Sequence, residues 1–301
     1  MYESDLSILI PTYNNVCYDL VADLSKQVVA NKLNAEIIVM DDASANTASI
    51  ESNQAINHLP HVRFIELKEN LGRAKVRNKL ADISNGRYIL FIDSDAEVID
   101  NHFLLNYMSV TPQYKVICGG IKTGNNSTAA NCSLRLRYEL KAEKIRTLKY
   151  RHRHPNDYLS TFNLLIEHDL FNVIHFSEQT EKYGYEDAML GIELEKRGIV
   201  VHHIDNPLLH KGIDTNEQYL KKVEMALLSL YQLGPSMQQR ANVSMLYGKI
   251  RSLHLGLAVH WLYCLLKSPL KKNLLSSRPS LLLLSFYKLG YYDYIVRKNK
   301  L

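Results

Sequence analysis

Short apolar runs alternate with helical patterns along the first hundred residues of the chain. Apolar residues at helical spacing predict helices over residues 16–30 and 71–83. Runs of five or six residues, rich in Ile and Val and without polar alternation, predict strands buried on both faces over residues 6–10, 36–40, 62–67 and 88–92. Strands and helices that take turns in this way predict an α/β fold, a doubly wound, mostly parallel sheet flanked by helices.

The pattern loosens after residue 120. Helices are predicted over residues 133–148, 169–173, 187–197 and 215–233, and strands over residues 159–166 and 199–204. The basic cluster at residues 149–154 is interpreted as a solvated loop. From residue 238 onward, Leu, Tyr and Trp stand between Lys and Arg. We therefore predict an α/β domain over residues 1–235 and a helical C-terminal appendage over residues 236–301.

The composition excludes several classes of protein. With 301 residues, 46% of them hydrophobic and 22% charged, the chain can bury a sizeable core, which excludes disorder and a small disulfide scaffold. Its four cysteines are scattered without a C-x-x-C pair, which argues against a zinc ribbon and favours a reducing cytosol. The acidic and polar start of the chain predicts that no signal peptide directs its export.

The net charge of +5 is unevenly distributed along the chain. Residues 240–301 contain 11 Lys and Arg against one acidic residue, Asp293, and so carry +10, whereas residues 1–239 carry −5. A basic segment of this kind predicts contact with an anionic surface. Because the segment is rich in leucine, we expect that surface to be phospholipid and not nucleic acid.

Large apolar residues recur every four positions in this basic segment: Leu253, Leu257, Trp261 and Leu265. The spacing predicts an interfacial helix, with a second apolar surface at residues 281–287, although a helix packed in the core would show the same spacing. The longest uncharged stretch has 15 residues, fewer than the ~20 that a transmembrane helix needs. We therefore expect a peripheral membrane protein at the inner, cytoplasmic face of the cell membrane.

Polar side chains follow three of the predicted strands. They stand in the segments Pro11-Thr12-Tyr13-Asn14, Asp41-Asp42-Ala43-Ser44 and Asp93-Ser94-Asp95. Because the carboxyl ends of parallel strands meet at one edge of a sheet, these groups should come together where ligands bind. An aspartate there can accept hydrogen bonds from a base or a ribose, and the two carboxylates of Asp-Ser-Asp can hold a divalent cation against phosphate oxygens. The same tripeptide also occurs in ordinary surface turns.

Five segments together resemble the family 2 inverting nucleotide-sugar glycosyltransferases, which have the GT-A fold. The segments are residues 7–14, 37–44, 69–78, 86–95 and 183–187, and they stand in the family's order. The resemblance implies that residues 1–235 form a GT-A domain with hexosyltransferase activity, as in polysaccharide biosynthesis. It implies transfer of a hexose or N-acetylhexosamine from a UDP-sugar to a hydroxyl of a glycan or lipid-linked saccharide, with Mn²⁺ or Mg²⁺ as cofactor.

The resemblance also implies roles for individual residues. The nucleotide would be bound by Pro11, Thr12, Tyr13, Asp42, Arg73, Arg77 and Asp93, with Asp42 hydrogen-bonded to the uracil. The metal would be held by Asp95, His210 and Asp93, a D-x-D motif with a histidine added. Asp187 would be the catalytic general base, with Glu186 beside it.

Each of these roles has an alternative. The acidic pair could simply cap the helix that follows it, and His210 could be only a packed or solvated side chain. The two arginines could be surface charges that pair with Glu69 or Asp82. A non-catalytic, membrane-associated scaffold that binds nucleotide sugars would need the same binding residues. A sugar nucleotidyltransferase would share the sheet and the metal, but the loop after the first strand lacks the glycines that such an enzyme needs. The start of the segment at residues 160–167 departs from the family pattern, which leaves the acceptor open.

Overall fold

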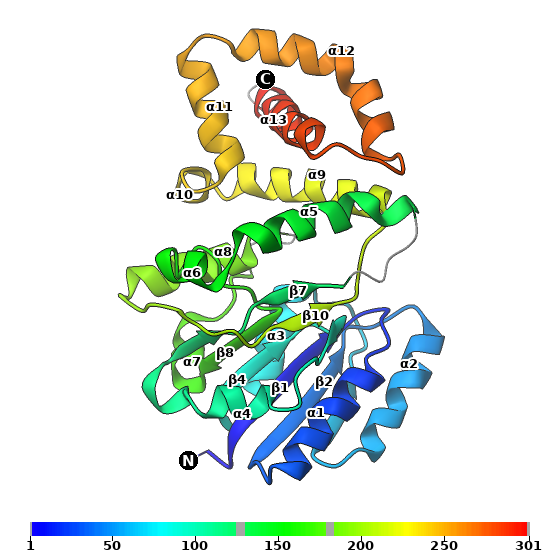
Figure 1. Cartoon of the computed structure of the whole chain (residues 1–301), viewed down its shortest axis with the longest axis vertical. Coiled ribbons are helices and arrows are strands. Elements are labelled where there is room, and N and C mark those ends of the chain that lie inside the picture. The colour runs from blue at the N-terminus through cyan, green and yellow to red at the C-terminus, as the bar shows by residue number, and fades with distance from the viewer. Residues whose placement is uncertain (1, 125–129, 179–183, 300–301) are drawn as a thin grey trace. The chain divides into compact units, whose positions relative to one another are not determined.

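The computed structural model describes residues 2–124, 130–178 and 184–299 (Figure 1). The chain forms two compact units. The first comprises Met1–Gly124, Glu143–Glu178 and Glu186–Gly212, and the second comprises Asn125–Ala142, Gln179–Tyr185 and Ile213–Leu301. The second unit therefore contains residues 213–235 together with the predicted appendage, and the domain boundary at residue 235 stays a prediction.

A seven-stranded sheet forms the centre of the first unit, in the order β3-β2-β1-β4-β8-β6-β9. Its strands are β1 (Ser4–Thr12), β2 (Ala35–Asp41), β3 (Val62–Glu66), β4 (Gly86–Ile92), β6 (Val116–Cys118), β8 (Asn163–Glu167) and β9 (His202–His203). The strand pairs β1–β2, β2–β3 and β1–β4 are parallel, whereas β8 runs antiparallel to both β4 and β6. The predicted α/β fold with a mostly parallel sheet is confirmed.

Helices cover both faces of this sheet (Figure 1). α1 (Tyr18–Ala30) and α4 (Phe103–Met108) pack on one face, and α3 (Arg73–Asp82), α7 (His168–Ile174) and α8 (Glu186–Lys196) pack on the other. Along β1, Ile8 and Ile10 join the first core while Leu9 joins the second. Because successive side chains of a strand point to opposite faces, two-sided burial requires the unbroken apolar runs seen in the sequence.

Short elements complete the first unit. A small sheet has the order β5-β10-β7, with β5 (Ala96–Glu97), β7 (Ile121–Thr123) and β10 (Leu208–His210), and none of its strands was predicted. The helix α2 (Thr47–Gln54) was not predicted either, since its sequence has no apolar face. Short 3₁₀ turns lie at Ala55–His58 and Thr111–Gln113, and a third, at Ala130–Cys132, belongs to the second unit.

The basic cluster at residues 149–154 corrects one prediction. Instead of one helix over residues 133–148 followed by a solvated loop, the structure has α5 (Ser133–Ile145) and a separate helix α6 (Leu148–Arg153). Arg151 is buried and donates hydrogen bonds to the backbone oxygens of Cys118 (3.3 Å) and Ile204 (3.1 Å). The loop interpretation is wrong because a run of charges does not reveal that one of its members is an internal hydrogen-bond donor.

The second unit is helical, which confirms the predicted helical appendage. Its C-terminal helices are α9 (Asn216–Gln232), α10 (Pro235–Gln238), α11 (Asn242–Ser252), α12 (Gly256–Leu274) and α13 (Leu281–Lys298). On α13, Leu284 and Tyr287 are buried whereas Leu282 is 79% exposed, so the predicted second apolar surface at residues 281–287 is divided between core and solvent. Among the described residues, no helix combines the length and the apolar character needed to cross a bilayer.

A buried carboxylate joins two of these helices. Asp293 of α13 is fully buried, and it accepts hydrogen bonds from His260 of α12 (2.8 Å) and from Arg297 (2.9 Å). Gly290 lies against Tyr263, where a Cβ atom would approach the tyrosine ring to 2.3 Å. The absence of a side chain at Gly290 thus lets α12 pack closely on α13.

Candidate functional site

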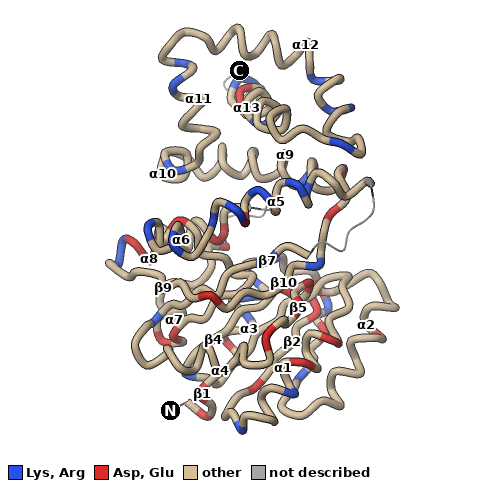
Figure 2. The backbone as a smooth tube through the Cα atoms, in the orientation of Figure 1, with Lys and Arg blue, Asp and Glu red and all other residues tan. Residues whose placement is uncertain are grey.

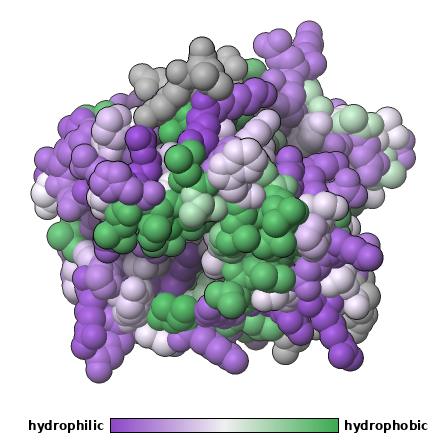
Figure 3. All heavy atoms as spheres, turned by 90° about the horizontal axis from the view of Figure 1, so that it is seen from above, coloured by the Kyte–Doolittle hydropathy of each residue, from purple (hydrophilic) through white to green (hydrophobic). Residues whose placement is uncertain are grey.

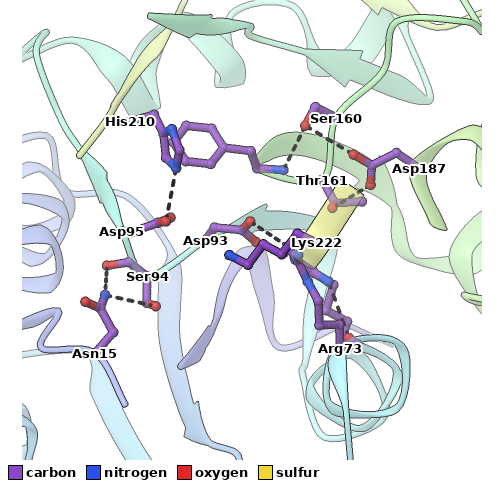
Figure 4. Close-up of polar contacts among 12 residues, drawn as sticks. Asn15, Arg73, Asp93, Ser94, Asp95, Ser160, Thr161, Asp187, His210 and Lys222 are labelled. Atoms are coloured by element: carbon purple, nitrogen blue, oxygen red, sulfur yellow. Dashed lines mark hydrogen bonds and ion pairs between the residues drawn. The ribbon is translucent and has the colours of Figure 1, made fainter. Parts of the chain in front are cut away.

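The three predicted polar segments lie at one edge of the large sheet, because β1, β2 and β4 are adjacent and parallel. The backbone N–H of Asn14 donates to Ser44 Oγ (2.6 Å), which connects the loops after β1 and β2. The side-chain amide of Asn15 donates to the backbone oxygen of Ser94 (2.9 Å), which connects the loops after β1 and β4 (Figure 4). The three loops therefore form one continuous frame.

Asp42 fixes the start of α3 within this frame. Its two carboxylate oxygens accept hydrogen bonds from the backbone N–H groups of Leu71 (2.7 Å) and Gly72 (2.9 Å). Gly72 has a φ of 84°, a left-handed conformation that favours glycine. Asp42 is only 4% exposed. Its position therefore sets where α3 begins and where the arginines of that helix lie.

The end of β1 carries the other residues predicted to contact the nucleoside. Thr12 is buried and donates to the backbone oxygen of Asn15 (3.1 Å), and Pro11 is partly buried. Tyr13, in contrast, is 51% exposed. Of these three residues, Tyr13 has the accessible side chain that stacking on a base requires, and the nucleotide-binding roles of all three stay predictions.

Asp93 accepts hydrogen bonds from two arginines of α3. Arg73 donates to one carboxylate oxygen (3.1 Å), and the buried Arg77 donates to the other. Burial acts to raise the pKa of Asp93, but the positive charges of Arg77 and Arg73 outweigh it and hold the pKa below its ordinary value. The arginines thus pair with Asp93 across the site. Ligation of a metal by Asp93 stays a prediction, and both of its oxygens already accept from a guanidinium.

Asp95 and His210 come together from distant parts of the sequence. β10 pairs with β5 so that His210 lies opposite Ala96, and His210 Nε2 lies 3.1 Å from Asp95 Oδ2 (Figure 4). Gly212 lies against the same carboxylate, since a Cβ atom there would stand 2.1 Å from Asp95 Oδ2. The structure therefore brings together two of the three predicted metal ligands as an oxygen and a nitrogen donor.

The donor pair fits a divalent cation. Two neighbouring ligands of an octahedral ion, each ~2.1 Å from it, lie ~3 Å apart, which is close to the separation of Asp95 and His210. Among the described residues, neither this site nor any other contains three or more His, Cys, Asp or Glu side chains close enough to hold a metal ion. A cation held by this pair would therefore need further ligands from water or from a bound phosphate.

Asp187 lies in the first turn of α8, with Glu186 before it at the helix start. Thr161 Oγ1 donates to Asp187 Oδ1 (2.7 Å), and Ser160 Oγ donates to Oδ2 (3.2 Å) (Figure 4). Burial raises the pKa of Asp187 above its ordinary value, while the hydrogen bond from Thr161 and the charge of Arg77 oppose that rise. These hydroxyls hold the carboxylate in place, which a simple helix cap would not need.

Sequence reasoning missed Ser160, Thr161, Asn15 and Gly212 as parts of the site. The hydroxyl pair stands just before β8, and because β8 is antiparallel to β4, its amino end lies at the carboxyl edge of the parallel strands. Two hydroxyl residues directly before an apolar strand were a visible signal, but only the strand direction gives that signal its meaning. For Gly212, we find no signal in the sequence.

Residues 7–170 match the family described as "Glycosyl transferase family 2", more than half of the chain. The chain belongs to this family. The expected class of enzyme, a glycosyltransferase, is thereby confirmed at the level of the family, and so is the sequence resemblance from which it was predicted.

Relatives of known name match parts of this family 2 chain. Glycosyltransferase GlyG of Streptococcus pneumoniae is 26% identical over 183 residues, which cover 57% of this chain and 60% of GlyG. The UDP-Glc:alpha-D-GlcNAc-diphosphoundecaprenol beta-1,3-glucosyltransferase WfaP of Escherichia coli is 37% identical over 93 residues, 30% of this chain and 35% of WfaP. The match thus spans less than two thirds of the length of either relative.

Solved structures share the fold. The mannosyltransferase PcManGT from Pyrobaculum calidifontis, in complex with GDP-Man and Mn²⁺, has a TM-score of 0.59 at 12% identity, over 99% of this chain and 87% of that chain. S. aureus TarS 1-349 in complex with UDP-GlcNAc has a TM-score of 0.51 at 19% identity, over 75% of this chain and 66% of that chain. At such identities the likeness shows the fold alone, and it agrees with the predicted GT-A type.

Proposed function

We propose that this protein is an inverting, metal-dependent glycosyltransferase. It moves a hexose or N-acetylhexosamine from a UDP-sugar to a hydroxyl of a glycan or lipid-linked saccharide. The observation that carries the proposal is the convergence of three groups at one edge of the sheet: the Asp95–His210 pair, Asp93 with its arginines, and Asp187. In the view of Figure 4, Asp93 lies between the Asp95–His210 pair and Asp187.

A UDP-sugar donor is supported by two of the similar proteins. TarS is crystallised with UDP-GlcNAc, and WfaP is named for a UDP-Glc donor and an acceptor on diphosphoundecaprenol. The exposed ring of Tyr13 at the end of β1 gives this chain a surface on which a base can stack. Asp42, which is buried, acts in our proposal by fixing the start of α3, and its carboxylate oxygens can accept a further hydrogen bond from the base.

Asp187 serves as the general base in this proposal. As the acceptor hydroxyl oxygen bonds to the anomeric carbon, the bond from that carbon to the nucleoside diphosphate breaks, and the hydroxyl proton passes to Asp187. A base works best when its pKa is near the working pH, so the raised pKa of Asp187 suits the task. Thr161 and Ser160 hold the carboxylate in place, and Glu186 beside it would contact the acceptor.

Asp95 and His210 would hold the divalent cation. When bound, the cation would neutralise the charge that develops on the leaving diphosphate. Imidazole is a ligand of transition-metal ions more than of Mg²⁺, so the histidine favours Mn²⁺. Asp93 holds the side chains of Arg73 and Arg77 in place. The two guanidinium groups provide positive charge near the Asp95–His210 pair, where they could contact phosphate or sugar hydroxyls.

The test combines UDP binding with turnover. Calorimetric titration with UDP should show tighter binding in Mn²⁺ than in EDTA for the wild type, and Asp95→Ala should remove that difference. Asp82→Asn, which alters an exposed carboxylate of α3, is the matched control and should behave like the wild type.

Turnover separates an enzyme from a scaffold. Slow hydrolysis of a UDP-sugar without acceptor, lost in Asp187→Asn but not in Asp82→Asn, would support transfer chemistry. A chain that binds UDP-sugars in Mn²⁺ yet neither hydrolyses nor transfers any of them would be a scaffold, and the proposed activity would be wrong. Binding that is the same in Mn²⁺ and EDTA would refute the metal.

A further inference from the structure

The outer face of α12 exposes large apolar side chains. Four of them, which we call the α12 face, are Leu253 just before the helix and Leu257, Trp261 and Leu265 on it, with exposed fractions of 66%, 62%, 71% and 77%. The opposite side of α12 buries Tyr263, Leu270 and Leu274, and Tyr263 packs against Tyr287 and Gly290 of α13. The helix therefore has one apolar side in the core and another apolar side in solvent.

These exposed side chains are neighbours. Leu257, Trp261 and Leu265 recur every four residues along one stripe of α12. Leu253 lies in the turn between α11 and α12, and Leu255 and Leu262 are 52% and 46% exposed. Figure 3 shows apolar side chains that adjoin one another on the face seen from above Figure 1. Single exposed leucines are ordinary in soluble proteins, but a contiguous apolar patch marks a surface that binds something.

The charge around the α12 face identifies its partner. Basic residues precede and follow the stripe along the chain, Lys249 and Arg251 on α11 and Lys267 and Lys272 on α12, and all four are exposed. Figure 2 shows Lys and Arg positions on both helices. The one carboxylate within residues 240–301 is Asp293, which is fully buried and paired with Arg297. An apolar stripe between lysines and arginines complements the acyl chains and phosphate headgroups of an anionic bilayer.

We propose that the α12 face docks this protein on the surface of an anionic membrane. The helix lies along the interface, with the stripe toward the acyl chains and the basic residues at the headgroups. The sequence alone could not decide whether these residues lie at a membrane interface or in the core, and their exposure favours the interface. The predicted inner face of the cell membrane agrees with the charge of this surface. This proposal does not depend on the chemistry proposed for the site.

The chain provides its own reporter, because Trp261 is its only tryptophan. In the full-length protein, vesicles of 30% phosphatidylglycerol in phosphatidylcholine should shift the Trp261 emission to shorter wavelength, and brominated lipids should quench it. Each basic residue near the surface contributes about fivefold to affinity, so pure phosphatidylcholine or high salt should weaken binding strongly. A shift equal for both lipids, or no shift at all, would overturn the proposal.

Two variants sharpen this test. Leu265→Glu places a charge in the stripe and should weaken vesicle binding at least ~tenfold. Val173→Glu is the matched control, because Val173 is 61% exposed on α7 of the other unit and should leave binding unchanged. If Trp261 emission shifts with protein concentration in the absence of lipid, together with a doubling of mass, the α12 face binds a second copy and the membrane proposal is refuted.

Discussion

Gly212→Ala should disable the Asp95–His210 pair while leaving the fold intact. The backbone of Gly212 does not have a positive φ, so alanine is allowed there. The added methyl group, however, would stand 2.1 Å from Asp95 Oδ2, 2.8 Å from its Cγ and 2.9 Å from its Cβ. Because the Cβ and Cγ atoms of Asp95 are also too close, a rotation of its carboxylate alone cannot relieve the clash.

The size of the effect follows from these distances. An ordinary contact of carbon with oxygen needs about 3.4 Å, so the carboxylate must move by more than ~1 Å, away from its 3.1 Å contact with His210. A displacement of ~1 Å in a reacting constellation costs about 100-fold in rate. We therefore expect UDP-sugar turnover to fall about 100-fold, with a melting temperature within a few degrees of the wild type.

The assay measures turnover and UDP binding across a Mn²⁺ titration. Gly248→Ala is the control, because nothing lies within 4 Å of a Cβ atom at that helical position. If Gly212→Ala keeps turnover within about threefold of the wild type and the same response to Mn²⁺, Asp95 does not need its present position, and the metal role that we give it is wrong.

Four further predictions concern buried or partly buried carboxylates. Asp187→Asn should lower turnover by ~10²–10⁴ with little change in UDP affinity, and Glu186→Gln should be milder; the reverse order in steady-state kinetics would exchange their roles. The base must be ionised to accept a proton, and the pKa of Asp187 lies above the ordinary 3.8 of aspartate. A pH profile of kcat/KM should therefore lose its activity on the acidic side at a pH above 3.8. The same raised pKa makes ionised Asp187 cost stability as pH rises above 3.8, so Asp187→Asn should melt no lower than the wild type at pH 8 in a thermal-shift assay. Asp293→Ala should destabilise the second unit by about 3 kcal/mol in chemical denaturation, since it leaves Arg297 without its partner, and Ser285→Ala should not.

The parallel strands of the sheet were predictable because the residues of each strand alone determine whether it can be buried on both faces. A strand buried on both faces has to be apolar at every position, and β1, β2 and β4 satisfy this rule directly. The loops that follow these parallel strands then lie at the same edge of the sheet, whatever the structure of the rest of the chain. That is why Asp42, Asp93 and Asp95 could be named from the sequence as neighbours.

The remainder of the site depends on long-range pairing. Ser160 and Thr161 join it because β8 is inserted antiparallel between β4 and β6, and His210 joins it through a β10 of three residues. Neither the direction of a strand nor the pairing of so short a strand leaves a periodic pattern in the sequence. The α12 face has the same difficulty, since a stripe with a spacing of four residues is identical whether it meets a core or solvent.

The way the chain is shared between the two units has a consequence for engineering. It passes from one unit to the other five times before it ends. The pair Glu186 and Asp187, for example, follows directly on a segment of the second unit. Neither unit can therefore be isolated by truncating the chain at a single position. Replacing only the C-terminal helices with those of a relative would leave the second unit composed of segments from two different proteins. Chimeras would have to exchange residues 125–142, 179–185 and 213–301 together to keep the second unit whole.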